Sequence, residues 1–216
     1  HARVGIPRRI GEKVFLTRND GLQNQSVIFV KDSEEAEERV FLDPNGLSED
    51  GTVTANLSGA SPDGRYVVEV RNAAGSDWQE MRVLDLTTGE SMGEVLEWVK
   101  FAGAAWVEGG FYYSRYPAPE GSAYSAENTF HSVYFHKVGT PQAEDELVFR
   151  NDDEPNRYHF CGTTEDGQYV VLNTSTGTDG NSLHVKSLKG RGRCVVSVDR
   201  SSRLLITTTA RSAWAR

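Results

Sequence analysis

The chain has 216 residues, of which 38% are hydrophobic and 25% are charged, with 21 glycines and 7 prolines. This composition is typical of a turn-rich globular protein and excludes a disordered or fibrous one. The formal net charge of -8 argues against a nucleic-acid surface, because phosphate binding requires clustered Lys and Arg. We therefore expect no nucleic-acid partner.

The sequence also bears on the compartment. No apolar run approaches the roughly 20 residues of a membrane span, and residues 1–9 contain no apolar core of a secretory signal. Cys161 and Cys194 are the only cysteines, too few for a disulfide framework, which favours a reducing compartment. We expect a cytoplasmic protein without a membrane partner, with the periplasm as the alternative.

Short runs rich in Val, Tyr, Phe and Thr follow one another along the chain, separated by glycine-containing turns, and helical periodicity is nearly absent. Residues 33–39 are too few and too acidic for a stable helix and are expected to form a loop with a turn. The clearest predicted strands are residues 27–30, 66–70, 81–86, 111–114, 133–136, 169–172 and 204–209. The sequence therefore predicts an all-β protein.

A glycine-containing turn that leads into an aromatic or β-branched strand recurs four times, at residues 11–15, 61–67, 109–113 and 165–170. The turn glycines are spaced by about 46 to 57 residues, close to the length of one four-stranded propeller blade. We predict a partial β-propeller of about four four-stranded antiparallel blades, with Asp63-Gly64 and Asp166-Gly167 in equivalent turns. The chain end could also supply the start of a fifth blade. The alternative fold is a β-sandwich, in which turns would come about every 8 to 12 residues.

The sharpest motif is Gly89-Glu90-Ser91-Met92-Gly93, which matches the G-x-S-x-G nucleophile elbow of α/β-hydrolases. In an elbow, the serine stands between a core strand and a long helix. Residues 94–99, which follow the motif here, are too few for that helix and resemble a strand. We expect a turn between two blade strands and assign no catalytic residue, so an autonomous hydrolase that uses Ser91 is the least favoured function.

The histidines do not predict a metal centre. His131 and His136 are five residues apart on a predicted strand, so their side chains point to opposite faces. His159 and Cys161 would share a face, but no second spaced pair completes a zinc set. We expect no metal and no cofactor, and a structural or surface role for these residues.

Residues 19–26, Asn-Asp-Gly-Leu-Gln-Asn-Gln-Ser, are more specific than a generic repeat, and further distinctive segments accompany them in order. These are residues 40–45, 47–52, 75–78, 97–101, 105–106, 134–142 and 153–155. Together they resemble the N-terminal β-propeller region of the prolyl oligopeptidase (prolyl endopeptidase) family. The likeness runs from about Gly11 to about Leu188 and thins beyond it, where the segment from Gly190 to Arg203 is shorter than the family pattern.

The resemblance implies a family in which a seven-bladed propeller is joined to an α/β-hydrolase domain. The Ser-Asp-His triad of that domain cleaves short peptides after proline through an acyl-enzyme, and the propeller covers the cleft and limits entry. We expect residues 1–216 to be one partial propeller domain, with the hydrolase domain absent and the chain end a boundary within a larger protein. The chain itself is then not expected to be catalytic.

By the same resemblance, four positions lie on the substrate side. Phe101 matches an aromatic of the pocket for the substrate residue two before the scissile proline-side position, Tyr158 matches another apolar pocket residue, and Thr178 a small residue at its border. Ser175 stands where better-known relatives have an arginine that contacts the peptide backbone, and a hydroxyl cannot replace a charged fork. Ordinary blade packing is the alternative for Phe101 and Tyr158.

These expectations favour the substrate-gating propeller of a serine endopeptidase that cleaves after proline. Its expected partners are short proline-containing peptides and the α/β-hydrolase domain of the same parent protein, and open blade edges favour self-association. A free-standing propeller that binds proteins is the alternative from another class. It would need ring closure and Trp-Asp blade endings, which this sequence lacks.

Overall fold

The structure is a computed structural model that describes residues 1–73, 76–119, 128–177, 179–189, 193–198 and 204–207. Across these residues the regular elements are β-strands, joined by turns and by two short 3-10 helices, η1 (Pro44–Gly46) and η2 (Gln142–Glu144). The all-β prediction is confirmed. The chain divides into two compact units, His1–Val95 and Leu96–Arg216, each of which is described by itself.

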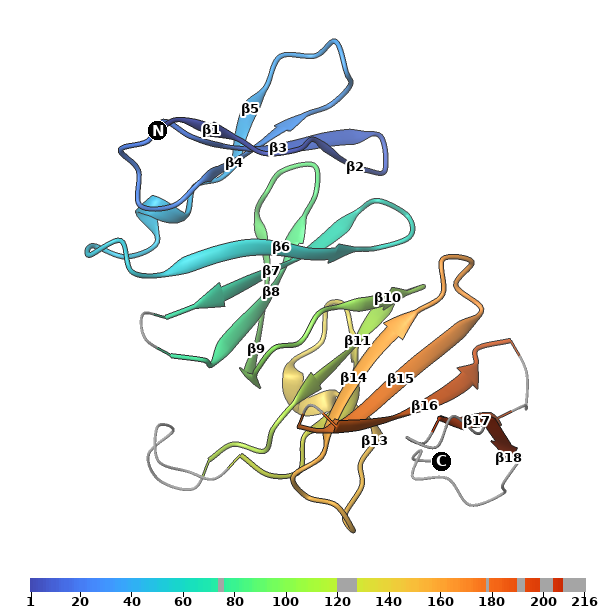
Figure 1. Ribbon diagram of the computed structural model, residues 1–216. Helices are drawn as coiled ribbons and strands as arrows, with labels where there is room; N and C mark the ends of the chain where they lie inside the picture. The colour runs from blue at the N-terminus through green and yellow to red at the C-terminus, as the bar shows by residue number, and fades with distance from the viewer. Residues whose placement is uncertain (74–75, 120–127, 178, 190–192, 199–203, 208–216) are drawn as a thin grey trace. The chain divides into compact units, whose positions relative to one another are not determined.

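The first unit contains two antiparallel sheets (Figure 1). The first sheet has the order β1-β3-β4-β5, with β2 also paired to β3, and the second has the order β6-β7-β8-β9. Strands adjacent in sequence are thus mostly adjacent in space, as in a chain of hairpins. The strands are β1 (Arg3–Val4), β2 (Arg8–Ile10), β3 (Lys13–Asn19), β4 (Val27–Lys31), β5 (Arg39–Leu42), β6 (Thr54–Ala60), β7 (Tyr66–Asn72), β8 (Gln79–Asp85) and β9 (Ser91–Val99), whose end belongs to the second unit.

The apolar residues of these two sheets form one core. Val30 of β4 and Val67 of β7 are completely buried, and Leu84 of β8 belongs to the same cluster. Phe15 meets Phe41 edge to face, with ring centroids 5.1 Å apart. Each fully buried side chain of this size contributes about 1.5–3 kcal/mol, so the packing of one sheet on the other stabilises the unit.

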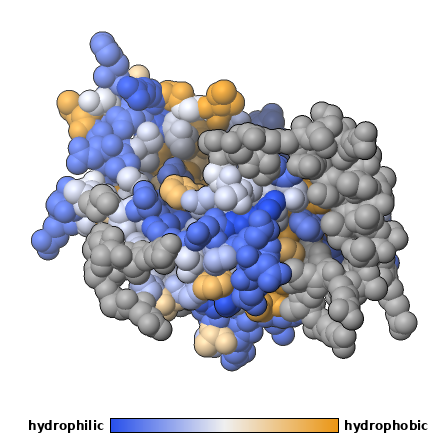
Figure 2. All heavy atoms as spheres, turned by 60° about the horizontal axis from the view of Figure 1, so that its bottom comes forward, coloured by the Kyte–Doolittle hydropathy of each residue, from blue (hydrophilic) through white to orange (hydrophobic). Residues whose placement is uncertain are grey.

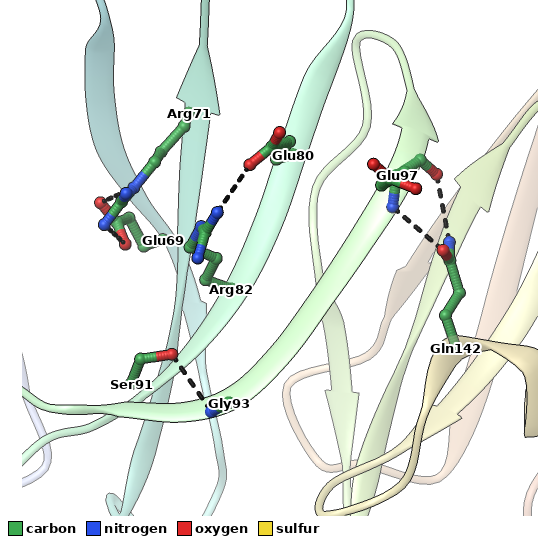
Figure 3. Close-up of polar contacts among 8 residues, drawn as sticks. All are labelled: Glu69, Arg71, Glu80, Arg82, Ser91, Gly93, Glu97 and Gln142. Atoms are coloured by element: carbon green, nitrogen blue, oxygen red, sulfur yellow. Dashed lines mark hydrogen bonds and ion pairs between the residues drawn. The ribbon is translucent and has the colours of Figure 1, made fainter. Parts of the chain in front are cut away.

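A buried charge lies in the second sheet. Glu69 of β7 is completely buried, and the guanidinium of Arg71 donates two hydrogen bonds of 2.6 and 2.9 Å to its carboxylate (Figure 3). Across the ladder Glu69 faces Arg82 and Arg71 faces Glu80, and Arg82 donates to Glu80 at 2.9 Å. Opposite charges therefore face each other along β7 and β8, which offsets the cost of burying a carboxylate.

The second unit also contains two antiparallel sheets, with the orders β10-β11-β12-β13 and β14-β15-β16-β17-β18. Val133, Val170 and Leu172 are completely buried and cluster with Tyr112 and Phe149, which joins the two sheets into a core. The strands are β10 (Ala105–Val107), β11 (Gly110–Arg115), β12 (Ser132–Lys137), β13 (Glu146–Phe149), β14 (Tyr158–Thr163), β15 (Tyr169–Thr176), β16 (Asp179–Ser187), β17 (Arg193–Val198) and β18 (Leu204–Thr207).

The turns at Gly64 and Gly167 are built alike. The Gly64 amide donates to the carbonyl of Ser61 at 2.9 Å, and the Gly167 amide donates to the carbonyl of Thr164 at 2.8 Å. In both turns the first residue's hydroxyl donates to the aspartate before the glycine, at 2.5 and 2.6 Å. Both glycines have positive φ, 69° and 63°, which other residues adopt only with strain. The predicted equivalence of these turns is confirmed.

The other two glycine turns join β2 to β3 and β10 to β11, so each of the four turns lies near the start of one sheet. Four sheets match the four predicted blades in number. In the described residues β18 pairs with β17 and extends the fourth sheet, so the suggested start of a fifth blade is not found there. Ser33 and Ala36 form the expected turn, with a backbone hydrogen bond of 3.3 Å. None of the described helices has the length and apolar character needed to cross a membrane.

Candidate functional site

Ser91 opens a strand and no helix follows it. The turn before it is closed by backbone hydrogen bonds from the Asp85 amide to the Glu90 carbonyl at 2.9 Å and from the Gly89 amide to the Asp85 carbonyl at 2.8 Å. The Ser91 hydroxyl accepts a hydrogen bond from the Gly93 amide at 3.2 Å (Figure 3). The motif is therefore a turn between β8 and β9, as expected, and differs from the strand-turn-helix of a nucleophile elbow.

Phe101 lies in the connection between β9 and β10, and 65% of it is exposed. Its φ of 51° and the φ of 62° at Trp98 place two bulky residues of one short segment in the left-handed region. The Trp98 carbonyl accepts a hydrogen bond of 2.9 Å from the amide of Tyr116, which follows β11. The phenylalanine ring is thus presented to solvent rather than packed within a blade.

Tyr158 and Ser175 are direct cross-strand partners in the β14–β15 ladder. Such partners point to the same face of the sheet with Cβ atoms about 4.5–5.5 Å apart, so the structure brings these two predicted residues together. Both are half-buried. The Tyr158 ring stacks on Phe160 with centroids 6.0 Å apart and meets His131 at 6.1 Å. Part of the tyrosine therefore stays open to solvent beside the serine.

Thr178 lies outside the described residues. Gly177, which precedes it, has a φ of 64° at the end of β15, next to a register shift between Ser175 and Thr176. Among the other three predicted residues, the structure joins two across one ladder and places Phe101 on a separate connection of the same unit.

Arg157 is a candidate that the sequence did not single out. Its guanidinium donates to the hydroxyls of Thr174 at 3.0 Å and Ser182 at 2.8 Å, and to both carboxylate oxygens of Glu154 at 2.9 and 3.0 Å. These bonds tie the start of β14 to β15 and β16 and so fix the backbone that carries Tyr158. The signal in the sequence is the three-residue spacing of Glu154 and Arg157, which is too common to be specific.

Two buried histidines hold β14 as well. His131 and His159 are 2% and 1% exposed, and the Nδ1 atom of His131 accepts a hydrogen bond of 3.0 Å from the His159 amide. Burial, aided by His159, lowers the pKa of His131 to about 3. Burial, aided by Arg157 and His184, lowers the pKa of His159 to about 4. Both rings are therefore neutral near pH 7, as an accepting Nδ1 requires.

Within the described ranges no group of three or more His, Cys, Asp or Glu side chains could hold a metal ion. His136 is instead paired with Asp145, Nδ1 to Oδ1 at 2.7 Å, with both side chains fully buried. Burial raises the pKa of Cys161 to about 12, so it is a protonated thiol and not a thiolate ligand. The site offers aromatic and hydroxyl contacts to a ligand.

Residues 1–211 match the family model of the prolyl oligopeptidase N-terminal β-propeller domain. This match extends past Leu188, where the likeness seen in the sequence thinned. The chain is 39% identical over 193 residues to a prolyl endopeptidase of Elizabethkingia meningoseptica, which covers 88% of this chain and 27% of that protein.

Solved structures share the fold. One from a structural and mechanistic analysis of two prolyl endopeptidases has a TM-score of 0.76 at 29% identity, over 99% of this chain and 34% of that one. Prolyl oligopeptidase B from Galerina marginata, bound to a 35mer hydrolysis and macrocyclization substrate, has a TM-score of 0.77 at 25% identity, over 100% of this chain and 31% of that one. The four sheets are thus blades of a partial β-propeller, and the chain spans between 27% and 34% of the length of these relatives.

Proposed function

This chain belongs to the prolyl oligopeptidase family and matches the family's N-terminal β-propeller domain, and we propose that it gates the substrate site of a serine endopeptidase that cleaves short peptides after proline. The observation that carries the proposal is the placement of Tyr158 directly beside Ser175, both partly open to solvent, in a chain with this fold. Short proline-containing peptides are the proposed ligands. The peptide-bound structure of the Galerina relative supports substrate contact in proteins of this fold.

Phe101 and Tyr158 supply the apolar part of the proposed site, and Thr178 is the proposed small residue at its border. In the proposal, Phe101 and Tyr158 contact the substrate residue two before the scissile proline-side position. An exposed phenylalanine and a half-buried tyrosine gain when an apolar side chain covers them, at about 25 cal/mol for each Å² removed from water. Because 65% of Phe101 is exposed, a bound peptide can still bury most of its surface.

Ser175 supplies a polar contact of modest strength. A neutral hydrogen bond contributes about 0.5–1.5 kcal/mol, whereas one from a charged group contributes about 1.5–3 kcal/mol. With a serine hydroxyl in place of an arginine guanidinium, the proposed site binds the peptide backbone less tightly. Binding then depends more on the aromatic contacts of Tyr158 and Phe101.

The proposal takes residues 1–216 to be one partial propeller domain. It assigns hydrolysis to an α/β-hydrolase domain that is joined to this propeller in the same parent protein. An activated serine needs a histidine that takes its proton and an acid that orients the histidine. The Ser91 hydroxyl instead accepts a bond from a backbone amide. No catalytic residue of this chain enters the proposal.

We also propose a cytoplasmic location, with the periplasm as the alternative, and self-association through uncovered strand edges. Val4, Ile6 and Leu22 of the first unit are 72%, 94% and 92% exposed. On the face seen in Figure 2, hydrophobic residues form separate groups among hydrophilic ones. Val4 lies on β1, at one edge of the first sheet, and exposed apolar residues at a strand edge favour such contacts.

The substrate-site proposal is tested by length-dependent kinetics of the full-length parent. Phe101→Ala and Tyr158→Ala should each weaken kcat/KM by roughly 1–3 kcal/mol for peptides long enough to reach the pocket, and hardly at all for the shortest substrates. Tyr169→Ala, at a partly exposed aromatic of the same unit, is the matched control and should change neither. Equal losses for both peptide lengths would show an effect on folding or domain docking and would contradict the pocket.

A second measurement addresses the assignment of catalysis. The 216-residue chain alone should not cleave a chromogenic peptide with proline before the scissile bond, and Ser91→Ala should leave that result unchanged. Turnover by the chain that disappears in the Ser91→Ala variant would contradict the proposal and restore the nucleophile-elbow interpretation.

A further inference from the structure

The segment that carries Phe101 is strained. Trp98 and Phe101 both have positive φ, 62° and 51°, although neither is a glycine. Such conformations cost on the order of 1–3 kcal/mol each and persist only where the surroundings over-determine them. With 65% of its surface exposed, Phe101 makes few packing contacts that could do this. Hydrogen bonds of the backbone that precedes Phe101 can supply this constraint.

The side chain of Gln142 holds that backbone at Glu97. Its Oε1 accepts from the Glu97 amide and its Nε2 donates to the Glu97 carbonyl, both at 3.1 Å (Figure 3). The carboxamide thus pairs with the end of β9 as a neighbouring strand would. The Trp98 carbonyl is held in turn by the Tyr116 amide. The peptide groups on both sides of Trp98, which lies three residues before Phe101, are therefore fixed.

A buried network fixes the orientation of this carboxamide. The Gln142 Nε2 also donates to the Tyr113 hydroxyl at 3.0 Å, and that hydroxyl donates to Asp145 Oδ2 at 2.6 Å. The other oxygen of Asp145 meets His136 Nδ1 at 2.7 Å. Tyr113 and the side chains of Asp145 and His136 are fully buried. Burial, with the hydrogen bond to Asp145, raises the pKa of Tyr113, so its hydroxyl stays a donor.

The short 3-10 helix η2 explains how Gln142 and Asp145 reach the same hydroxyl. In a 3-10 helix the side chains of residues three apart eclipse each other. The Asp145 amide donates to the Gln142 carbonyl at 3.1 Å and closes this turn. Both side chains therefore leave on one side and meet Tyr113 together. Flipping the carboxamide would set Nε2 against the Glu97 amide, so only one orientation satisfies every partner.

We propose that Gln142 is a positioning residue for Phe101. Its carboxamide, oriented by the Tyr113 and Asp145 network, holds the end of β9 in the conformation that presents the Phe101 ring to the peptide. The inference rests on the proposed function, because it takes Phe101 to be a substrate contact; Gln142 itself does not touch the substrate. Without the carboxamide, water replaces the two bonds at Glu97 and the ring is free to take several directions.

The first test observes the ring without any substrate. Fluorophenylalanine at position 101 of the full-length parent should give one narrow fluorine resonance, and Gln142→Met should broaden, split or shift it. Methionine is close to glutamine in size but makes neither bond to Glu97. Gln79→Met removes a glutamine that bonds Asn72 in the first unit and should leave the resonance unchanged. An unchanged resonance in Gln142→Met would overturn the positioning role.

Gln142→Glu gives a readout that a merely structural role would not move. A carboxylate accepts from the Glu97 amide but cannot donate to the Glu97 carbonyl, whereas a protonated carboxyl does both. The fluorine resonance of Gln142→Glu should therefore be altered near pH 8 and return toward the native one as the pH falls toward the carboxyl pKa, about 4.3 or higher when buried. A pH-independent resonance would contradict the role, even if Gln142→Met failed to fold.

Kinetics of the parent protein complete the test. Gln142→Met should lower kcat/KM about three- to tenfold for peptides that reach the pocket, the worth of about one hydrogen-bonded contact, and should cause no further loss when combined with Phe101→Ala. Equal losses in both backgrounds would overturn the inference. An altered fluorine resonance without any kinetic effect of Gln142→Met or Phe101→Ala would support the positioning and contradict the proposed function.

Discussion

The two aromatic contacts of the proposed site are held in opposite ways. Phe101 is exposed, lies between strands, and keeps a left-handed backbone because polar bonds hold Glu97 and Trp98. Tyr158 begins a regular strand and is half-buried against His131. One contact depends on a constrained backbone, the other on packing around neutral buried rings. Acid and core substitutions should therefore act on the Tyr158 side, and changes in backbone freedom on the Phe101 side.

The largest expected effect is acid sensitivity on the Tyr158 side. The pKa values of His131 and His159 are about 3 and about 4 in the folded chain, against about 6.5 when unfolded. The unfolded chain binds these protons at a higher pH than the folded chain does. The contribution of the two neutral histidines to the free energy of unfolding is therefore fully present above about pH 6.5 and is lost as the pH falls toward 4, by roughly 2–3 kcal/mol for each histidine. Chemical unfolding at about pH 7 and about pH 4.5 measures this loss.

His131→Gln is the control for this prediction, since it removes one titrating ring but keeps an acceptor for the His159 amide. About half of the pH dependence should disappear in that variant. Hydrogen exchange in acid should also rise at the His159 amide before it rises at the Glu97 amide. A variant with the same pH dependence as the wild type would show that the buried rings do not cause it.

Glycine substitutions at Tyr158 and Phe101 should change the free energy of unfolding in opposite directions. Tyr158→Gly loses ring packing and loosens a strand, so it should lower the free energy of unfolding by about 2 kcal/mol. Phe101→Gly loses little burial and relieves a left-handed backbone, so it should raise that free energy by about 0.5–1 kcal/mol. Urea unfolding of both variants makes the comparison. Equal destabilisation by both would contradict the strained backbone at Phe101.

A smaller effect is expected where the neighbouring sheet holds β14. Ser114 is 1% exposed, and its hydroxyl donates to the carbonyl of His159 at 2.6 Å. Ser114→Ala should lower the free energy of unfolding by about 1 kcal/mol, the usual worth of one hydrogen bond. Ser91→Ala, at an exposed serine, should change it by less than half of that amount. Similar values for the two serines would mean that this bond does not fasten β14.

The sequence predicts the features that local chemistry determines. The Asp-Gly turns at Gly64 and Gly167 follow from glycine's tolerance of positive φ and from the aspartate's bonds to nearby backbone. The pairing of Tyr158 with Ser175 needs more than the presence of a turn, because it requires the exact residues at which the two strands begin and end. It depends on the register of the β14–β15 hairpin, which the geometry of the connecting Gly167 turn fixes and which runs without irregularity from Thr163 to Tyr158.

The backbone conformation of Phe101 is even harder to predict from the sequence. A bulky aromatic is disfavoured at positive φ, so no local signal predicts its conformation. The residue that compensates is Gln142, which bonds Glu97 from 45 positions away in the chain. Family resemblance pointed to Phe101 as a contact, and the structure supplies the physical reason for its exposure.

The most direct test of the central claim is photo-crosslinking to the full-length parent, with the serine of its proposed hydrolase domain replaced so that the peptide stays intact. A short proline-containing peptide carries a benzophenone side chain two residues before the scissile proline-side position, and mass spectrometry identifies the labelled segments. The account predicts labels on the segments that contain Phe101 and Tyr158, suppressed by excess unlabelled peptide. Competed labelling confined to other segments would contradict the assignment of this propeller surface to the substrate site.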